Sequence, residues 1–179
     1  GYEIQYTTRQ GYFDSNPNEV KSQTVPSNIS HAEVTGLELG QTYFFRVRAT
    51  NDQGNSPWSS IKSITLGKDP TAPTTWSSTT TAIVGEELVL YWVHNATDGS
   101  SEKQAELELN VDGTITTETI VNTATGDDKD KTKSKKINTS KWSEGTTLKW
   151  RVRTMGITGN YGEWSVQRVV NIYAPATLQ

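Results

Sequence analysis

The sequence predicts an all-β protein made of two β-sandwich domains in tandem. The first observation is a repeat: a shift of 105 positions places Gly40 on Gly145 and Arg46-Val47-Arg48 on Arg151-Val152-Arg153. After one inserted residue in the second copy, the same alignment places Trp58-Ser59 on Trp164-Ser165. The second observation is that apolar and polar residues alternate in both copies, which is typical of half-buried strands. The third is an apolar content of 32% and a mean hydropathy of −0.64, which suit small β domains.

Charge and residue content exclude several classes of function. A net charge of −3 and a pI near 5.4 disfavour a nucleic-acid binder, which needs a basic face to neutralise phosphates. The absence of cysteine excludes disulfides and thiolate metal sites, and it favours a bacterial or viral origin. No apolar run is long enough to span a membrane. The start at Gly1 resembles neither a signal peptide nor an initiator sequence, so we expect a fragment of a longer protein.

Residues 1–67 are predicted to form the first domain. Expected strands, in chain order, are 2–6, 19–24, 28–35 and 43–50, with a corner at 36–40. Side chains alternate across a strand, so Tyr43, Phe45 and Val47 are predicted to face the core. Arg46 and Arg48 then face outward on the other side of the sheet.

The first domain resembles fibronectin type III domains, which are immunoglobulin-like sandwiches. The matching pattern is the opening Tyr-x-Ile-x-Tyr followed by Gly36-Leu37, Gly40, Tyr43, Phe45, Val47, Ala49, Asn51 and Gly54. This resemblance implies that the Tyr43 hydroxyl hydrogen-bonds to nearby backbone. It also implies that strands A and B should precede Tyr2, so residues 1–67 hold only strands C to G. Because exposed apolar side chains forfeit about 1.5–3 kcal/mol each, we expect a stable first domain to need strands from elsewhere.

Residues 68–73 contain two prolines and are predicted to be a stiff linker, and residues 74–179 a complete second domain of the same type. Leu88, Leu90 and Trp92 share one face of a strand over 87–94 and are predicted core residues. Trp142, in the place of the Gly-Leu corner, and Trp150 are predicted to join them. Residues 124–136 carry mostly charged side chains, and we expect a mobile loop there.

The candidate site is an arginine and tryptophan stack in each domain. Arg46 and Arg48 are predicted to lie beside Trp58, and Arg151 and Arg153 beside Trp164, where a cation–π contact contributes about 0.5–1 kcal/mol. We interpret both stacks as structural staples, with a ligand-binding surface as the alternative. The pattern resembles the Trp-Ser box of cytokine-receptor domains. Those domains carry cysteines and a doubled Trp-Ser, which this chain lacks.

No catalytic, cofactor or metal site is predicted, so we expect a non-enzymatic protein. His31 and His94, the two histidines, fall in different predicted domains. Asp127, Asp128 and Asp130 lack the closing Glu of a calcium loop and are interleaved with lysines. This cluster is therefore interpreted as part of a solvated loop.

The second domain resembles segments of tail proteins from phages and prophages of Gram-positive bacteria. The resemblance is carried by residues 71–78, 91–95, 98–101, 150–154 and 172–175. It implies a spacer and weakly adhesive segment of a larger protein, on a virion or at a cell surface. The expected partners are neighbouring domains or subunits and cell-envelope polysaccharide or protein. Two alternatives stay open: an accessory module of a secreted polysaccharide-degrading enzyme, and a receptor-like pair that binds protein.

Overall fold

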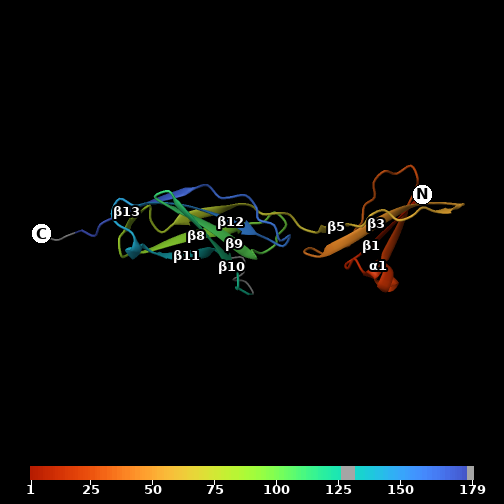
Figure 1. The fold of residues 1–179 in the computed structure, drawn as a ribbon, viewed down its shortest axis with the longest axis horizontal. Coiled ribbons are helices and arrows are strands. Elements are labelled where there is room, and N and C mark those ends of the chain that lie inside the picture. Colours follow the sequence, from red (N-terminus) through yellow and green to blue (C-terminus); the bar gives the residue numbers. More distant parts are fainter. Residues whose placement is uncertain (126–131, 177–179) are drawn as a thin grey trace. The chain divides into compact units, whose positions relative to one another are not determined.

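The computed structural model describes residues 1–125 and 132–176. The chain divides into two compact units, Gly1–Gly67 and Lys68–Gln179. Strands make up most of the regular structure in both units (Figure 1).

The first unit is a single antiparallel sheet. Strand β1 (Tyr2–Thr7) lies between β2 (Lys21–Val25) and β3 (Thr42–Asn51). The short strands β4 (Gly54–Asn55) and β5 (Lys62–Thr65) pair with β3 on its other side. A helical turn α1 (Tyr12–Ser15) and a 3-10 turn η1 (Pro17–Glu19) join β1 to β2. Residues 1–67 form no second sheet.

The core that the sequence predicts for the first unit is only partly confirmed. Tyr43 is buried, and its hydroxyl accepts a hydrogen bond from the Glu38 backbone N–H at 3.1 Å, which is the corner contact that the resemblance implies. Phe45 is only half-buried, and Val47 remains 39% exposed. The expectation that Val47 is a core residue is therefore wrong. The reason is physical, because no second sheet covers this face of β3.

The strand expected at residues 28–35 is also absent. This segment contains no regular strand, and most of its residues are exposed. A strand needs a neighbour to satisfy its N–H and C=O groups. Residues 28–35 pair with no strand of the first unit, so alternation alone did not produce a strand here.

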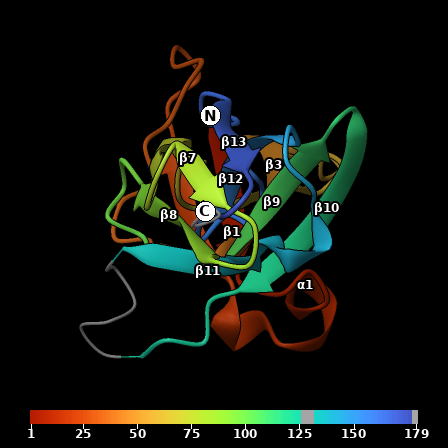
Figure 2. The ribbon, with the colours of Figure 1, turned by 90° about the vertical axis from the view of Figure 1, so that its left-hand side faces the viewer.

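The second unit is a closed sandwich of two sheets. One sheet has the order β10-β9-β12-β13-β7, and the other has the order β11-β8-β6. In Figure 2 β11 lies beside β8, and β9 lies beside β10, as their pairing requires. The strands, in chain order, are β6 (Thr71–Ser77), β7 (Thr81–Ile83), β8 (Glu87–Asn95), β9 (Gln104–Val111), β10 (Thr114–Val121), β11 (Lys133–Asn138), β12 (Thr147–Met155) and β13 (Arg168–Tyr173).

The core of the second unit lies between these two sheets. Alternate residues of β8, namely Leu88, Leu90 and Trp92, are at most 1% exposed. They pack with Trp150 and Val152 of β12 in one cluster. Trp142 is half-buried at its margin. Full burial of such side chains stabilises the unit by about 1.5–3 kcal/mol each relative to exposure.

Two boundary predictions need correction. Residues 68–73 are not all linker, because β6 begins at Thr71 and the rings of Pro70 and Pro73 are buried in the second unit. The charged loop is also shorter than predicted, since Lys133–Asn138 forms β11 and pairs with β8. Residues 126–131, including the three clustered aspartates, lie outside the described residues.

The corner before β12 is held without a tyrosine. Leu148 occupies the position equivalent to Tyr43 and is fully buried. Thr139, in the 3-10 turn η3 (Thr139–Lys141), donates its hydroxyl proton toward the carbonyl oxygens of Ile83 and Glu86, at 2.9 and 2.6 Å. A buried threonine hydroxyl thus replaces the phenol in tying this corner to a neighbouring loop.

Candidate functional site

The outward face of β12 in the second unit carries two arginines, each paired with a glutamate of β9. Arg151 binds Glu108 through two parallel hydrogen bonds of 2.9 Å, from Nε to Oε1 and from Nη2 to Oε2. Arg153 binds Glu106 Oε1 with Nε at 3.1 Å and Nη2 at 2.9 Å. The sheet register places each pair directly opposite. The pairs follow from alternation, because residues two apart on a strand share a face.

An indole ring covers both guanidinium groups of this unit. The Cζ atoms of Arg151 and Arg153 lie 4.5 and 4.7 Å from the centroid of the Trp164 ring. Tyr161 adds a second aromatic contact to Arg153 at 4.7 Å. The result is an arginine–tryptophan ladder, in which two strands contribute ion pairs and the following segment contributes the aromatic cover.

The first unit has the same ladder at equivalent positions. Arg48 binds Glu3 Oε2 with Nε at 2.7 Å and Nη2 at 2.6 Å, and Arg46 donates two hydrogen bonds to the Gln5 side-chain oxygen. Both Cζ atoms lie 4.3 Å from the Trp58 ring centroid. Phe13 of α1 contacts Arg46 at the same distance. Here α1, which lies between two of the expected strands, supplies the additional aromatic ring.

The serine after each tryptophan explains why the dipeptide repeats. Ser59 donates its backbone N–H to the Val47 carbonyl at 2.8 Å, and its hydroxyl accepts from the Val47 N–H at 3.1 Å. Ser165 makes the same two contacts with Val152, at 2.7 and 3.0 Å. Neither serine lies in a regular strand. The serine hydroxyl therefore takes the place of a partner strand's carbonyl as the acceptor for the valine N–H.

The electrostatics of the ladders favour the paired, ionised state. Hydrogen bonding to Glu108 raises the pKa of the Arg151 guanidinium. Burial alone would raise the pKa of Glu3, but hydrogen bonds from Arg48 and Ser22 outweigh it and lower that pKa. Each guanidinium already has hydrogen-bond acceptors and an aromatic face as partners. The arrangement thus holds strands together and presents no group poised for proton transfer or nucleophilic attack.

A buried carboxyl group of the second unit is also used inside the fold. Glu102 is 4% exposed, and its Oε2 accepts a hydrogen bond from Trp92 Nε1 at 2.9 Å. Burial raises the pKa of the Glu102 carboxyl, while the Trp92 hydrogen bond and the Lys133 charge lower it, and burial dominates. Sequence reasoning missed this pair because no local pattern marks a glutamate in a polar loop as buried.

The two histidines belong to different units. His31 is exposed on the irregular segment of the first unit, whereas His94 Nδ1 is 2.9 Å from the Thr154 hydroxyl in the second unit. Within the described residues, no three His, Cys, Asp or Glu side chains gather as a metal site would require. Asp127, Asp128 and Asp130, which sequence analysis also weighed as metal ligands, lie outside the described residues.

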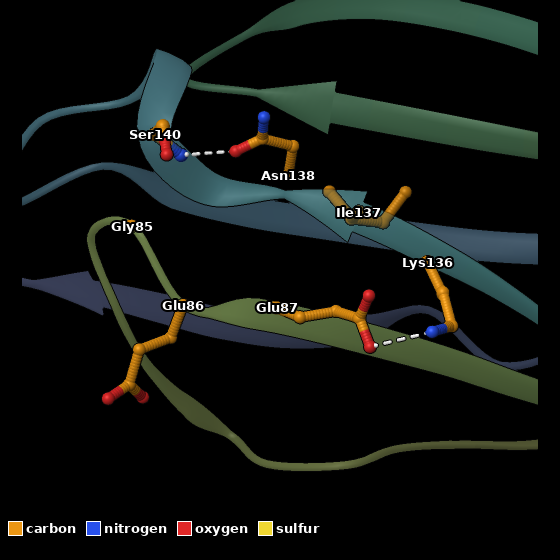
Figure 3. A pocket seen from close by; sticks show the side chains of 7 residues that line it. All are labelled: Gly85, Glu86, Glu87, Lys136, Ile137, Asn138 and Ser140. Carbon is orange, nitrogen blue, oxygen red and sulfur yellow. Dashed lines mark hydrogen bonds and ion pairs between the residues drawn. The ribbon is translucent and has the colours of Figure 1, made fainter.

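The surface clefts are shallow. One, of about 380 Å³, lies where the β7–β8 turn meets β11 in the second unit (Figure 3). Its polar contacts join neighbours: Lys136 Nζ lies 3.1 Å from Glu87 Oε1, and Asn138 Oδ1 accepts from the Ser140 N–H. The Glu86 side chain points away from Lys136 and Glu87 in this view. No set of polar groups converges on one point in this cleft.

An aromatic pair stands on the solvent face of the three-stranded sheet. Trp76 of β6 and Tyr91 of β8 are paired across the strands, with ring centroids 5.4 Å apart and planes at 13°. Trp76 remains 41% exposed. Cross-strand aromatic pairs stabilise sheets, and exposed Trp and Tyr are also the residue types most enriched in binding surfaces.

Comparison with known protein families finds one model that matches the first unit. Residues 1–65 match the model of the fibronectin type III domain. Such domains are in general non-catalytic modules that mediate protein interactions. No curated protein sequence is similar enough to this chain to count as a relative.

Three solved structures of chicken proteins align with this chain. A two-domain fibronectin type III segment of chicken tenascin aligns with a TM-score of 0.53 and 12% identity, over 95% of this chain and 83% of that one. The FN1–FN3 domains of chicken CNTN1 align with a TM-score of 0.44 and 18% identity, over 97% of this chain and 55% of that one. The chicken interferon gamma receptor alpha chain aligns with a TM-score of 0.46 and 13% identity, over 96% of this chain and 84% of that one. The tenascin match and the family model support an all-β fold of the fibronectin type III type.

None of the helices in the described part of the chain has the length and apolar character needed to cross a membrane.

Proposed function

We propose that this chain is a non-enzymatic structural and adhesive segment of a larger phage tail or bacterial surface protein, located on the virion or outside the cell. The observation that carries the proposal is the repeated ladder. In both units, the most strongly charged face of the sheet is used to join strands: Arg48 to Glu3 and Arg151 to Glu108. A module whose polar groups are engaged in this way serves best as a rigid spacer.

The adhesive part of the proposal concerns the second unit. Trp76 is exposed and stacks on the half-buried Tyr91, and the small polar residues Thr74 and Ser134 flank this pair on the same sheet face. An aromatic surface with a polar margin suits contact with a polysaccharide or a protein of a cell envelope. This pair is also the observation that favours the second candidate function, an accessory module of a secreted polysaccharide-degrading enzyme.

The test is a binding measurement with a fluorescent fusion of the whole chain. We expect the fusion to sediment with Gram-positive cell walls, and Trp76→Ala to reduce the bound fraction at least about 5-fold, because hot-spot aromatics contribute about 1 kcal/mol or more. Ile115→Ala, at another exposed apolar residue of the same unit, is the matched control. Retention on insoluble plant-type polysaccharide, but not on cell walls, would support the accessory-module function instead. No binding to either material would contradict an adhesive role.

A further inference from the structure

The outer edge of β10 (Thr114–Val121) is a long strand edge that has no partner strand among the described residues. β10 ends the five-stranded sheet on the outer side of β9 (Figure 2), and it pairs with β9 along all eight of its residues without a bulge. Seven of these eight residues are β-branched, and Glu118 is the only charged one. β-branched residues favour extended backbone, so this edge is well suited to pair with another strand.

The other edge strands of the second unit carry features that prevent such pairing. β11 has three lysines in six residues, and β7 is only three residues long. β6 contains Pro73, and its register with β8 shifts between Thr71 and Thr74. Lysines, prolines, irregular register and short length are the means by which soluble proteins avoid edge-to-edge association. Among the described strands of this unit, β10 is the edge strand that has none of them.

The backbone of β10 offers free hydrogen-bonding groups at alternate residues. Asp112 and Gly113, with φ of 48° and 94°, form the two-residue turn between β9 and β10. The residues that flank such a turn exchange both backbone hydrogen bonds, and hydrogen-bonded pairs then recur at every second position. The even-numbered residues of β10 therefore bond to β9. The N–H and C=O groups of four residues point away from β9: Ile115, Thr117, Thr119 and Val121.

The exposed side chains of β10 are arranged symmetrically about Glu118. Ile115 is 58% and Val121 62% exposed, and each lies three residues from Glu118 on the face of the arginine–tryptophan ladder. Two antiparallel β10 strands related by a twofold axis at Glu118 place Ile115 of each copy opposite Val121 of the other. Thr117 then lies opposite Thr119, and the outward backbone groups of these four residues face one another. A second copy of the chain thus supplies the apolar side chain that covers each exposed one.

We propose that β10 is a self-association edge, at which two copies of this chain pair their β10 strands antiparallel about a twofold axis at Glu118. The pairing joins the five-stranded sheets of the two copies into one continuous sheet. It closes as a dimer, because each β10 has one free edge. In each copy Lys135 Nζ lies 2.5 Å from Glu118 Oε1, so the two carboxylates meet at the axis with their charges already balanced.

The first test is the mass of the whole chain in sedimentation experiments from about 1 µM to about 1 mM, the range in which contacts of small area associate. The natural chain should approach twice the monomer mass at the upper end. Thr119→Pro removes one outward N–H and leaves the hydrogen bonds to β9, and edge strands tolerate proline at such positions. This variant should remain a monomer. Hydrogen exchange at Leu107 and Val152 checks that its second unit is folded.

The second test concerns the register. Ile115→Lys places an ammonium group opposite Val121 of the other copy and should weaken association at least about 10-fold. Adding Val121→Glu to the same chain should restore association, because the new lysine of each copy then lies opposite the new glutamate of the other. Val166→Lys, at an exposed valine outside the strands of the same unit, is the matched control and should leave association unchanged.

Three results would overturn the proposal: a natural chain that is still monomeric at about 1 mM, a folded Thr119→Pro variant that associates like the natural chain, or a double variant that associates no better than Ile115→Lys. If Thr119→Pro unfolds the second unit, the lysine series decides alone. The cell-wall assay uses the fusion far below the concentration at which copies pair. Binding through Trp76 and pairing through β10 are therefore decided separately.

Discussion

The two units share a ladder and differ in their cores. On the ladder face, Arg48 and Arg153 each pair with a glutamate and lie within 5 Å of an indole centroid, at 4.3 and 4.7 Å. On the opposite face, Val47 is 39% exposed whereas Val152 is 0% exposed. The comparison shows that the ladder is a local device of one sheet and its connecting segments. The core, in contrast, exists only where a second sheet is present.

The largest difference is expected for the two equivalent valines. Val152→Ala should lower the unfolding free energy of the second unit by about 2–3 kcal/mol, since it removes two buried methyl groups and leaves a cavity. Val47→Ala should lower that of the first unit by about 0.5 kcal/mol or less, because the side chain is largely uncovered. Native-state hydrogen exchange measures each unit separately. Equal losses would mean that the face of the first unit is buried in solution.

A second difference concerns a glycine. Gly162 aligns with Ser56, and both donate their backbone N–H to the preceding strand, to Thr154 and Ala49. A Cβ atom on Gly162 would lie 1.9 Å from the Pro70 carbonyl oxygen, at the start of β6. Gly162→Ala should therefore destabilise the second unit by about 1–3 kcal/mol through steric strain. Thermal unfolding measures the loss. Gly11→Ala, with open space around its Cβ position, is the control and should have little effect.

Replacing the tryptophan of either arginine–tryptophan ladder should lower the stability of its own unit by a similar amount. Trp58→Leu and Trp164→Leu each remove two cation–π contacts, and each should cost its own unit about 1–2 kcal/mol. Exchange protection at the amides of β3 and β12 measures the two losses. Similar losses would support a ladder that is independent of the second sheet. A loss confined to the second unit would show instead that the ladder depends on a closed core.

Sequence information was sufficient where the determinants are local. Alternation along β3 and β12 places the arginines together on the outer face, and the Tyr43 corner involves residues only five positions apart. It was insufficient where partners are distant. The strand expected at 28–35 is absent, and the start of β6 at Thr71, which removes residues 71–73 from the predicted linker, depends on pairing with β8. The burial of Glu102 against Trp92 likewise depends on packing that periodicity does not record.

The smallest expected effect is a change in pH dependence, and it is confined to the second unit. Burial raises the pKa of the Glu102 carboxyl above its ordinary value of 4.5. As pH rises above that value, the unfolded chain loses this proton before the folded unit does, so stability falls until the folded carboxyl has also ionised. Glu102→Gln keeps a side-chain oxygen that can accept from Trp92 Nε1 and has no charge to bury.

We therefore expect Glu102→Gln to match the natural chain below about pH 4.5 and to exceed its stability, by about 1 kcal/mol, at neutral pH. Denaturant unfolding of the second unit at pH 4 and pH 7 measures both values. The first unit is the internal control, because the position equivalent to Glu102 would precede Gly1 and the substitution changes none of its residues. If the variant were less stable at pH 7, the attraction between Glu102 and Lys133 would outweigh the cost of burying the carboxylate.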